Sequence, residues 1–212
     1  MTFGQVVGMA LVAYLIGSIP VAYLIGKLHG INVFEIGSGN MGAGNIARAV
    51  NKKWGGFTWF LDSTKGIVAI LIARQLAPPD QAAVATMVGA IAVIVGHVWS
   101  IFVVFITGRF RGGKGAATTI GTWFLFIPLP LIALVMSIWV LIVATTRLVS
   151  LAVITAIGLI SILIVGMVVT GSYQPIYLSY LLVSVLILFR HQENIKALIE
   201  GRERRLGDRS TY

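Results

Sequence analysis

The run LVSLAVITAIGLISILIVGMVV, residues 148–169, contains no charged side chain and no proline. A membrane-spanning helix needs about 20 consecutive apolar residues, so this run alone is long enough to cross a bilayer. Backbone N–H and C=O groups in lipid must be satisfied within the protein, which favours an α-helix. The run therefore predicts an all-α integral membrane fold.

The rest of the chain has the same character. Hydrophobic residues make up 58% of the 212 residues and charged residues only 11%, with a mean hydropathy of +0.94. A soluble domain of this length would need far more polar surface. We predict one integral membrane domain over residues 1–212 with seven crossings, at 6–28, 57–76, 82–106, 118–127, 131–144, 148–169 and 176–189. The fourth is short, and we expect a tilted or broken helix there.

The basic residues predict the orientation of these crossings. With the amino terminus outside, all 16 lysines and arginines except Arg74 fall inside, down to Arg209 in the tail. The cytoplasmic side then holds segments 29–56, 107–117 and 190–204 and the carboxyl terminus. We therefore assign the net charge of +9 to topology and anionic membrane lipid, and expect no nucleic-acid partner. The chain has no cysteine, and we predict no metal site and no cofactor.

The segment GSGNMGAGN, residues 37–45, is the first candidate binding site. Glycines let backbone N–H groups converge, and such a concavity binds anions. Ser38, Asn40 and Asn45 add neutral hydrogen-bond donors. Arg48 adds a planar guanidinium suited to phosphate. The alternative is a flexible loop with a solvated arginine, but such a loop seldom carries these polar residues so close together.

A second candidate is RFRGGKG, residues 109–115. Gly108 to Lys114 nearly fits the nucleotide P-loop pattern, but Gly115 stands where a Ser or Thr should bind magnesium. No buried strand precedes the motif either. We therefore reject a nucleotide site and expect glycine amides and Lys114 to hold a phosphate, with Thr118 following. The alternative, a basic loop that fixes topology, explains the arginines but not the glycines.

The third candidate follows the last crossing. His191 and Asn194 are three residues apart and so share one helical face. That face can look back toward the other two segments. We interpret the residues beyond Gly201, in contrast, as an interfacial amphipathic tail.

Three ionisable residues lie inside the predicted crossings. Asp62 and Lys65 are three apart in the second, and His97 is near the inner end of the third. Ionisable groups in a membrane are costly unless they are paired or line a polar cavity. A salt bridge that braces the site explains the first two at least as well as catalysis does. We assign all three a supporting role.

These segments together resemble a known family. The motifs occur in this order: Ser38-Gly39-Asn40-x-Gly42-Ala43-x-Asn45-x-x-Arg48, Asp62-x-x-Lys65-Gly66, Gly96-His97, Gly112-Gly113-Lys114-Gly115-x-Ala117-Thr118 and His191-x-x-Asn194-Ile195-x-x-Leu198-x-x-Gly201-x-Glu203. The chain is similar, from Gly17 to Glu203, to the bacterial acyl-phosphate-dependent glycerol-3-phosphate acyltransferase family, PlsY. No single motif is decisive, but five in order are specific.

The resemblance implies an enzyme of the bacterial inner membrane whose site faces the cytoplasm. It moves a fatty acyl group from acyl phosphate to the 1-hydroxyl of sn-glycerol 3-phosphate, giving lysophosphatidic acid and phosphate. This is the first acylation step of phospholipid synthesis. The family has seven helices, and a candidate partner is the enzyme that makes acyl phosphate. Acyl-CoA and acyl carrier protein are not direct donors.

Residue roles follow from the motifs and the resemblance together. We assign catalysis to Ser38, His191 and Asn194. Substrate binding is assigned to Gly39, Asn40, Gly42, Asn45, Arg48, Gly112, Gly113, Lys114 and Thr118. No Ser-His-Asp series or cysteine nucleophile is present, so we expect direct attack without an acyl-enzyme. The base is either a donor phosphate oxygen or His191.

The chain departs from the family's usual motifs at several places. Gly44 replaces a threonine, Ser100 a proline and Gln192 an arginine, and the stretch 107–111 is longer. Two other classes of protein stay open. A transporter or channel for an organic phosphate would need charges or broken helices near the midplane, whereas these ionisable groups gather at one face. A lipid-binding scaffold explains the basic tail but not the glycine-asparagine loop.

Overall fold

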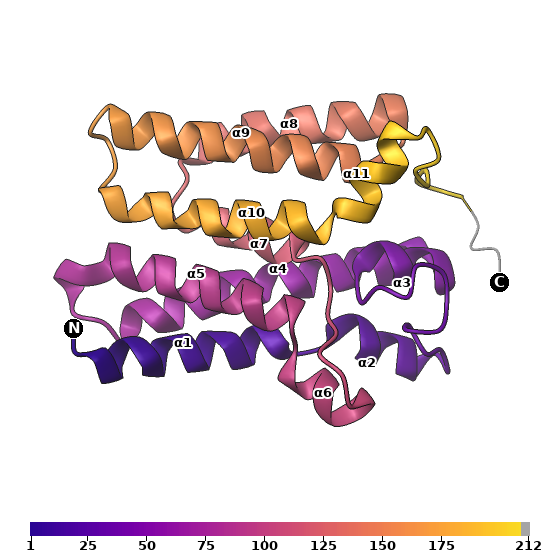
Figure 1. The fold of residues 1–212 in the computed structure, drawn as a ribbon, viewed down its shortest axis with the longest axis horizontal. Coiled ribbons are helices and arrows are strands. Elements are labelled where there is room, and N and C mark those ends of the chain that lie inside the picture. Colours follow the sequence, from indigo (N-terminus) through magenta and orange to yellow (C-terminus); the bar gives the residue numbers. More distant parts are fainter. Residues whose placement is uncertain (209–212) are drawn as a thin grey trace. The chain divides into compact units, whose positions relative to one another are not determined.

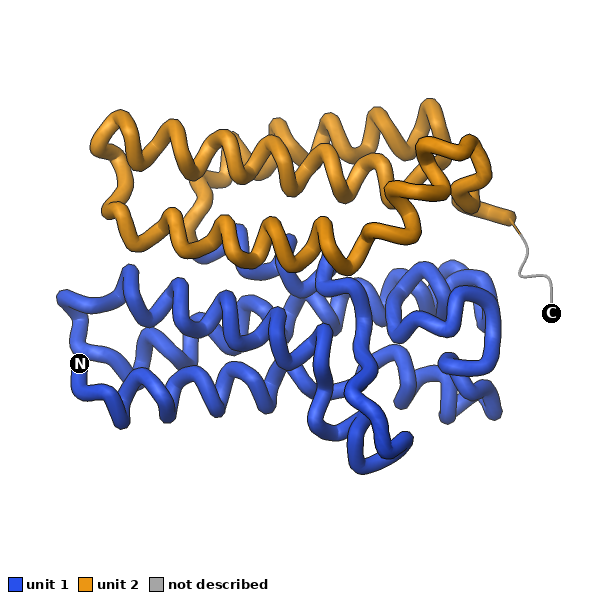
Figure 2. The backbone as a smooth tube through the Cα atoms, in the orientation of Figure 1, with its two compact units in different colours: residues 1–125, 209–212 blue, residues 126–208 orange. Residues whose placement is uncertain are grey.

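The computed structural model describes residues 1–208, which form two compact helical units (Figures 1 and 2). Arg209 lies outside the described residues. Unit 1, Met1–Leu125, contains α1 (Phe3–Ser18), α2 (Val21–Leu28), α3 (Ala43–Ala49), α4 (Lys52–Gln75), η1 (Pro79–Gln81), α5 (Ala82–Val98), α6 (Ile101–Thr107) and α7 (Ala116–Trp123). Unit 2, Phe126–Asp208, contains α8 (Leu129–Thr146), α9 (Val149–Val169), η2 (Pro175–Tyr180), α10 (Leu181–Arg190) and α11 (Gln192–Ile199).

Several of these helices are long and apolar enough to cross a membrane. Between residues 1 and 208 there are five such spans: Phe3–Leu28, Lys52–Gln75, Pro79–Val98, Leu129–Thr146 and Val149–Val169. A sixth counts if Pro175–Arg190 and Gln192–Ile199, bent by 57°, form one span. The expected all-α membrane fold is confirmed at this level. The helix in the region of the predicted fourth crossing, α7, has only 8 residues and so rises about 12 Å.

Two predicted crossings are interrupted. Pro20 separates α1 from α2, because its ring removes the N–H that a continuous helix would use. The crossing predicted at 82–106 stops at Val98. A new helix, α6, starts after Ser100, whose Oγ accepts a hydrogen bond from the Val103 N–H at 3.2 Å. Neither break was visible in the hydropathy, since Ser18, Pro20 and Ser100 are isolated among apolar residues.

The loop expected over 29–56 is also shorter than predicted. It contains α3, and α4 begins at Lys52 rather than at Phe57. The reason is local: the Asn51 side chain accepts a hydrogen bond from the Trp54 N–H at 3.0 Å. An asparagine in this capping position satisfies one of the unpaired N–H groups at a helix start.

Glycines let the helices of unit 1 pack backbone against backbone. A Cβ atom at Gly17 of α1 would overlap the Val93 carbonyl of α5, and one at Gly96 would overlap the Tyr14 carbonyl. The α4–α7 pair is built in the same way, with Gly121 against the α4 backbone. Close approach of this kind is how small residues drive helix association in membranes.

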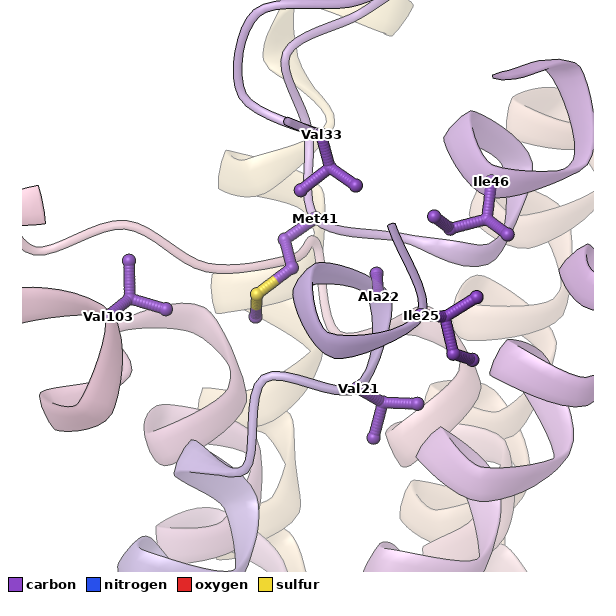
Figure 3. Close-up of a cluster of buried hydrophobic side chains, with 7 residues drawn as sticks. All are labelled: Val21, Ala22, Ile25, Val33, Met41, Ile46 and Val103. Carbon is purple, nitrogen blue, oxygen red and sulfur yellow. The ribbon is translucent and has the colours of Figure 1, made fainter. Parts of the chain in front are cut away.

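An apolar cluster holds down the segment that joins α2 to α3 (Figure 3). Its members are buried side chains from α2, this segment, α3 and α6: Val21, Ala22, Ile25, Val33, Met41, Ile46 and Val103. Met41 belongs to the glycine-rich segment 37–45 and is only 1% exposed. Burying a methionine side chain stabilises by about 1.5–3 kcal/mol, so the cluster ties the glycine-rich segment to the helices.

Unit 2 is built around α9, which packs against α8, η2, α10 and α11. The Ser161 hydroxyl of α9 donates to Ser184 Oγ of α10 at 2.8 Å. At the far end of α9, the Tyr173 hydroxyl donates to the Phe126 carbonyl. Unit 2 therefore has polar ties as well as apolar packing between its helices.

The glycine packing predicts a stability difference within α1. Gly17→Ala should destabilise the protein by about 1–3 kcal/mol, because the new methyl group overlaps α5. Gly8→Ala, in the same helix, has nothing within 4 Å of the new Cβ and should be neutral or stabilise by up to about 1 kcal/mol. Thermal unfolding in detergent measures both. Equal unfolding temperatures for the two variants would contradict this packing.

Candidate active site

The glycine-rich segment 37–45 is shaped by the side chain of Asn45. Its Nδ2 donates to the carbonyls of Val33 and Ile36, at 3.0 and 3.2 Å, and its Oδ1 accepts the Ser38 N–H at 3.2 Å. Asn45 is 2% exposed. Both ends of its amide thus serve the loop, and Asn45 holds the chain around Ser38 in place.

The residues of this loop predicted to bind substrate differ in exposure. Ser38 and Gly39 are exposed, whereas Asn40 and Gly42 are partly buried. Gly39 has φ of +60°, and a Cβ there would lie 3.2 Å from the Phe34 carbonyl oxygen, so this turn requires glycine. The loop therefore presents the Ser38 hydroxyl and the Gly39 backbone at its surface.

Arg48 lies in the last turn of α3, partly buried. A Cβ at Gly44, one turn earlier, would be 3.7 Å from its Nη1. A threonine, which the sequence resemblance implies at this position, would therefore lie against the guanidinium. Glycine leaves that space open beside the arginine.

Three buried ionisable side chains meet between α4 and α5. Lys65 Nζ lies 2.8 Å from Asp62 Oδ1, and His97 Nδ1 lies 3.6 Å from the same oxygen. Lys65 Nζ also donates to the Ile19 carbonyl, at 3.3 Å, where α1 gives way to α2. All three side chains are at most 5% exposed. The network ties α4 to α5 and to the break in the first span.

His97 in turn supports the second glycine-rich segment. Its carbonyl accepts the Gly113 N–H at 3.1 Å. A Cβ at Gly113 would overlap the His97 ring on one side and approach the Met41 carbonyl on the other, at 2.5 Å. Gly113 is therefore packed between His97 and the first loop. Two segments far apart in the sequence meet at this point of unit 1.

Gly112 and Lys114 flank this contact. A Cβ at Gly112 would overlap the carbonyls of His97 and Val98, so this glycine is also required by close approach. Lys114 is partly buried and precedes α7. Thr118, in the first turn of α7, is fully buried, and its Oγ1 has no hydrogen-bond partner within residues 1–208.

Ser100, where the sequence resemblance implies a proline, has a structural use. The Ser100 Oγ donates to the Ser18 carbonyl at 2.5 Å, and its backbone N–H donates to the Arg111 carbonyl at 3.3 Å. Proline could make neither bond. Ser100 thus joins the end of α1 and the stretch before Gly112.

In unit 2, the predicted pair stands at the bend between α10 and α11. The His191 Nδ1 is 2.8 Å from the Ile187 carbonyl, and the Asn194 Nδ2 donates to Glu203 Oε1 at 2.7 Å. The Ser150 hydroxyl donates to the same Glu203 oxygen at 2.8 Å. The interpretation of the chain beyond Gly201 as a mere interfacial tail was wrong, because Glu203 folds back and holds Asn194.

Sequence reasoning therefore included Glu203 in a motif without giving it a role, and it missed Ser150. Their pairing depends on a chain reversal at Gly201, where φ is +69°. A glycine that follows a short helix and precedes a carboxylate is the signal that could have shown it. Within the described part of the chain, no group of three or more His, Asp or Glu side chains is arranged to hold a metal ion.

The predicted residues thus fall into two sets. Unit 1 brings together the two glycine-rich segments and the buried network: Ser38, Gly39, Asn40, Gly42, Asn45, Arg48, Asp62, Lys65, His97, Gly112, Gly113, Lys114 and Thr118. Unit 2 contains His191 and Asn194 together with Glu203.

Known proteins match the chain along nearly its whole length. A protein named glycerol-3-phosphate acyltransferase from Rubrobacter xylanophilus is 36% identical over 206 residues, covering 95% of this chain and 96% of that protein. One of the same name from Gluconobacter oxydans is 38% identical over 205 residues, covering 95% and 93%.

Two crystal structures of PlsY, an integral membrane glycerol 3-phosphate acyltransferase, have the same fold. The glycerol 3-phosphate form has a TM-score of 0.83 and 37% identity, and covers 96% of each chain. The lysophosphatidic acid form has a TM-score of 0.80 and 36% identity, with the same coverage. The family model described as glycerol-3-phosphate acyltransferase matches residues 7–201. The chain therefore belongs to the glycerol-3-phosphate acyltransferase family.

Proposed function

We propose that this protein is a glycerol-3-phosphate acyltransferase that takes its acyl group from acyl phosphate. The acyl chain passes to the 1-hydroxyl of sn-glycerol 3-phosphate, and the products are lysophosphatidic acid and inorganic phosphate. Both substrates carry a phosphate group, so the site must hold two anions. Family membership supports the acyltransferase activity, and the donor is the part of this proposal that goes beyond the family's name.

The observation that carries the proposal is the meeting of two glycine-rich segments in unit 1. Gly113 packs between His97 and the Met41 carbonyl, which brings the Gly112–Lys114 turn against the segment containing Ser38. Glycine-rich turns that expose backbone N–H groups bind phosphate. Two such turns in contact, each with a nearby cation, suit a pair of phosphates better than one.

We assign the glycerol phosphate to Arg48 and Lys114, and the acyl phosphate to the loop with Ser38, Gly39, Asn40 and Gly42. Asn45 supports the latter loop by its internal hydrogen bonds. His191 and Asn194 orient the glycerol phosphate. Because a carbonyl only accepts, the bond to Ile187 puts a proton on His191 Nδ1, so the neutral ring accepts through Nε2.

Acyl transfer then needs no covalent intermediate. The 1-hydroxyl attacks the carbonyl carbon of acyl phosphate, the new ester bond forms, and phosphate leaves with its bonding electrons. Loop N–H groups and the Ser38 hydroxyl stabilise the oxyanion that forms in the transition state. The rest of the rate acceleration comes from holding both substrates close together in the reactive orientation. The hydroxyl proton goes either to an oxygen of the donor phosphate or to His191 Nε2.

We also propose the topology behind this chemistry: a single domain of seven crossings in a bacterial inner membrane, amino terminus outside. The three motif-bearing segments, 29–56, 107–117 and 190–204, then face the cytoplasm, as the basic residues indicate. The short helix α7 fits as the fourth crossing. Its residues Thr118–Trp123 are all buried, and short or broken helices are tolerated in membranes when protein surrounds them.

The function is tested by phosphate release from purified protein. With palmitoyl phosphate as donor, release should depend on added glycerol 3-phosphate and yield lysophosphatidic acid in equal amount. Palmitoyl-CoA should not replace the donor. Transfer from palmitoyl-CoA alone would refute the donor, and glycerol 3-phosphate uptake into liposomes without phosphate release would support a transporter. An acyl-enzyme trapped by hydroxylamine would refute direct attack.

The two cations should contribute mainly to binding the acceptor. Arg48→Ala and Lys114→Ala each remove a charge-assisted hydrogen bond of about 1.5–3 kcal/mol, and should raise the KM for glycerol 3-phosphate roughly 10- to 100-fold. Lys52→Ala is the matched control, since Lys52 is an exposed cation at the start of α4. A wild-type KM in either of the first two variants would contradict their assignment.

The absence of cysteine allows a direct test of topology. Single-cysteine variants at the exposed residues Lys52, Arg109 and Lys196 should react with an impermeant maleimide only after cells are opened. Variants at Asp80 and Ser172, also exposed, should react in intact cells. Labelling of any of the first three from outside would overturn the proposed single cytoplasmic face.

A further inference from the structure

The C-terminal tail is fastened to the turn between α8 and α9. The Leu206 N–H donates to the Arg147 carbonyl at 2.7 Å. In return, Arg147 Nε and Nη2 both donate to the Leu206 carbonyl, at 2.9 and 2.6 Å. One residue thus binds both backbone groups of a residue far along the chain. We call this reciprocal contact the tail latch.

Arg147 adopts an unusual backbone conformation to make this contact. Its φ is +62°, and it is the one residue other than glycine with positive φ among those described. The position follows the last turn of α8, where glycine or asparagine is usual. A left-handed conformation is unfavourable for residues other than glycine, because Cβ approaches the following carbonyl oxygen. An arginine here therefore implies that its side chain contributes something glycine could not, and the latch is what it contributes.

The latch is one of two fixed points on either side of Glu203. The other is the reversal at the end of α11, where the N–H groups of Gly201 and Arg202 donate to the carbonyls of Leu198 and Ala197, at 3.2 and 2.9 Å. This is the glycine-terminated helix end in which two bonds close the last turn. Only a few residues separate Gly201 from Leu206, so Glu203 has little freedom.

Glu203 passes this constraint on to Asn194. A carboxylate only accepts hydrogen bonds, so it fixes which end of the Asn194 amide faces it, namely Nδ2. The Ser150 hydroxyl, from the start of α9, steadies the same Glu203 oxygen. The plane and the sense of the Asn194 amide are thereby set before any substrate arrives.

We propose that Arg147 is a positioning residue: by latching the tail through Leu206 it holds Glu203, and through Glu203 it orients Asn194 toward glycerol 3-phosphate. The last step rests on the function proposed above, whereas the latch itself does not. Arg147 touches no substrate in this scheme. Its loss should weaken binding of the acceptor and leave binding of the acyl donor as it was.

The key variant is Arg147→Gly, because glycine suits the left-handed conformation and should fold at least as well as arginine. Leu206→Pro tests the latch from its other side without changing any charge, since proline lacks the N–H that Arg147 accepts. Leu206→Ala is the matched control. It keeps both backbone groups, and Leu206 is exposed, so it should behave as wild type.

Two measurements are made on each purified variant: hydrogen exchange of tail residues 203–208, and the affinity for glycerol 3-phosphate by calorimetry. We expect faster exchange in Arg147→Gly and Leu206→Pro, and affinity weakened on the order of tenfold, with the KM for acyl phosphate unchanged. Exchange at the wild-type rate in Arg147→Gly would refute the latch. Faster exchange with wild-type affinity would refute the positioning role.

The readouts separate this proposal from the proposed function. If wild type binds glycerol 3-phosphate but acyl phosphate is not its donor, the function fails, while the affinity series still decides on Arg147. If wild type does not bind glycerol 3-phosphate at all, the positioning role falls together with the function. A change in Leu206→Ala equal to that in Leu206→Pro would show that the leucine side chain, and not the latch, holds the tail.

Discussion

Two opposite charges buried inside one membrane helix are the constraint on which unit 1 depends. Asp62 and Lys65 would each be costly alone in α4, and one charge can be kept there only with the other. The pair reaches outward on both sides, to the Ile19 carbonyl at the break in the first span and to His97 of α5. These contacts therefore fix α1, α4 and α5 relative to one another around the buried pair. The second glycine-rich segment attaches beside it, through His97.

The glycine-rich segments are held in place by contacts with this network, and not by their own composition. Gly113 fits between His97 and the Met41 carbonyl only because it has no side chain. Met41 in turn belongs to the apolar cluster that includes α2. Asn45 completes the arrangement, because both ends of its amide form hydrogen bonds within its own loop. A loop held from several sides keeps its backbone in place before any ligand arrives, as the proposed stabilisation of the oxyanion requires. That preorganisation is what makes backbone donors effective in catalysis.

Much of the fold follows from hydropathy, because lipid demands an unbroken apolar surface. Residues 148–169 could be predicted as a helix almost to its ends, and α9 covers Val149–Val169. The breaks after Ser18 and Val98 could not, since single Ser and Pro residues barely change the hydropathy of a long apolar run. The breaks depend on the missing N–H of Pro20 and on hydrogen bonds from Ser100 to distant parts of the chain. The two glycine-rich segments were recognised from their composition, and they meet where Gly113 approaches the Met41 carbonyl, but their binding role stays a prediction. The role of Glu203 was not assigned, because it depends on contacts with Asn194 and Ser150 that form only when the chain reverses, and Gly201 was the one local signal of that reversal.

A carboxylate beside a residue assigned to a phosphate substrate needs a physical explanation, since Glu203 would repel that phosphate. Its oxygen Oε1 accepts hydrogen bonds from both Ser150 and Asn194, and these two donors partly offset its negative charge. Asp62 is treated in the same way, by Lys65. The chain has 7 acidic residues and 16 basic ones, so its net charge stays positive even though some acids serve to orient other side chains. Acids at these positions therefore act as internal acceptors that align Asn194 and Lys65, and in the proposed function the excess of arginine and lysine attracts the anionic substrates.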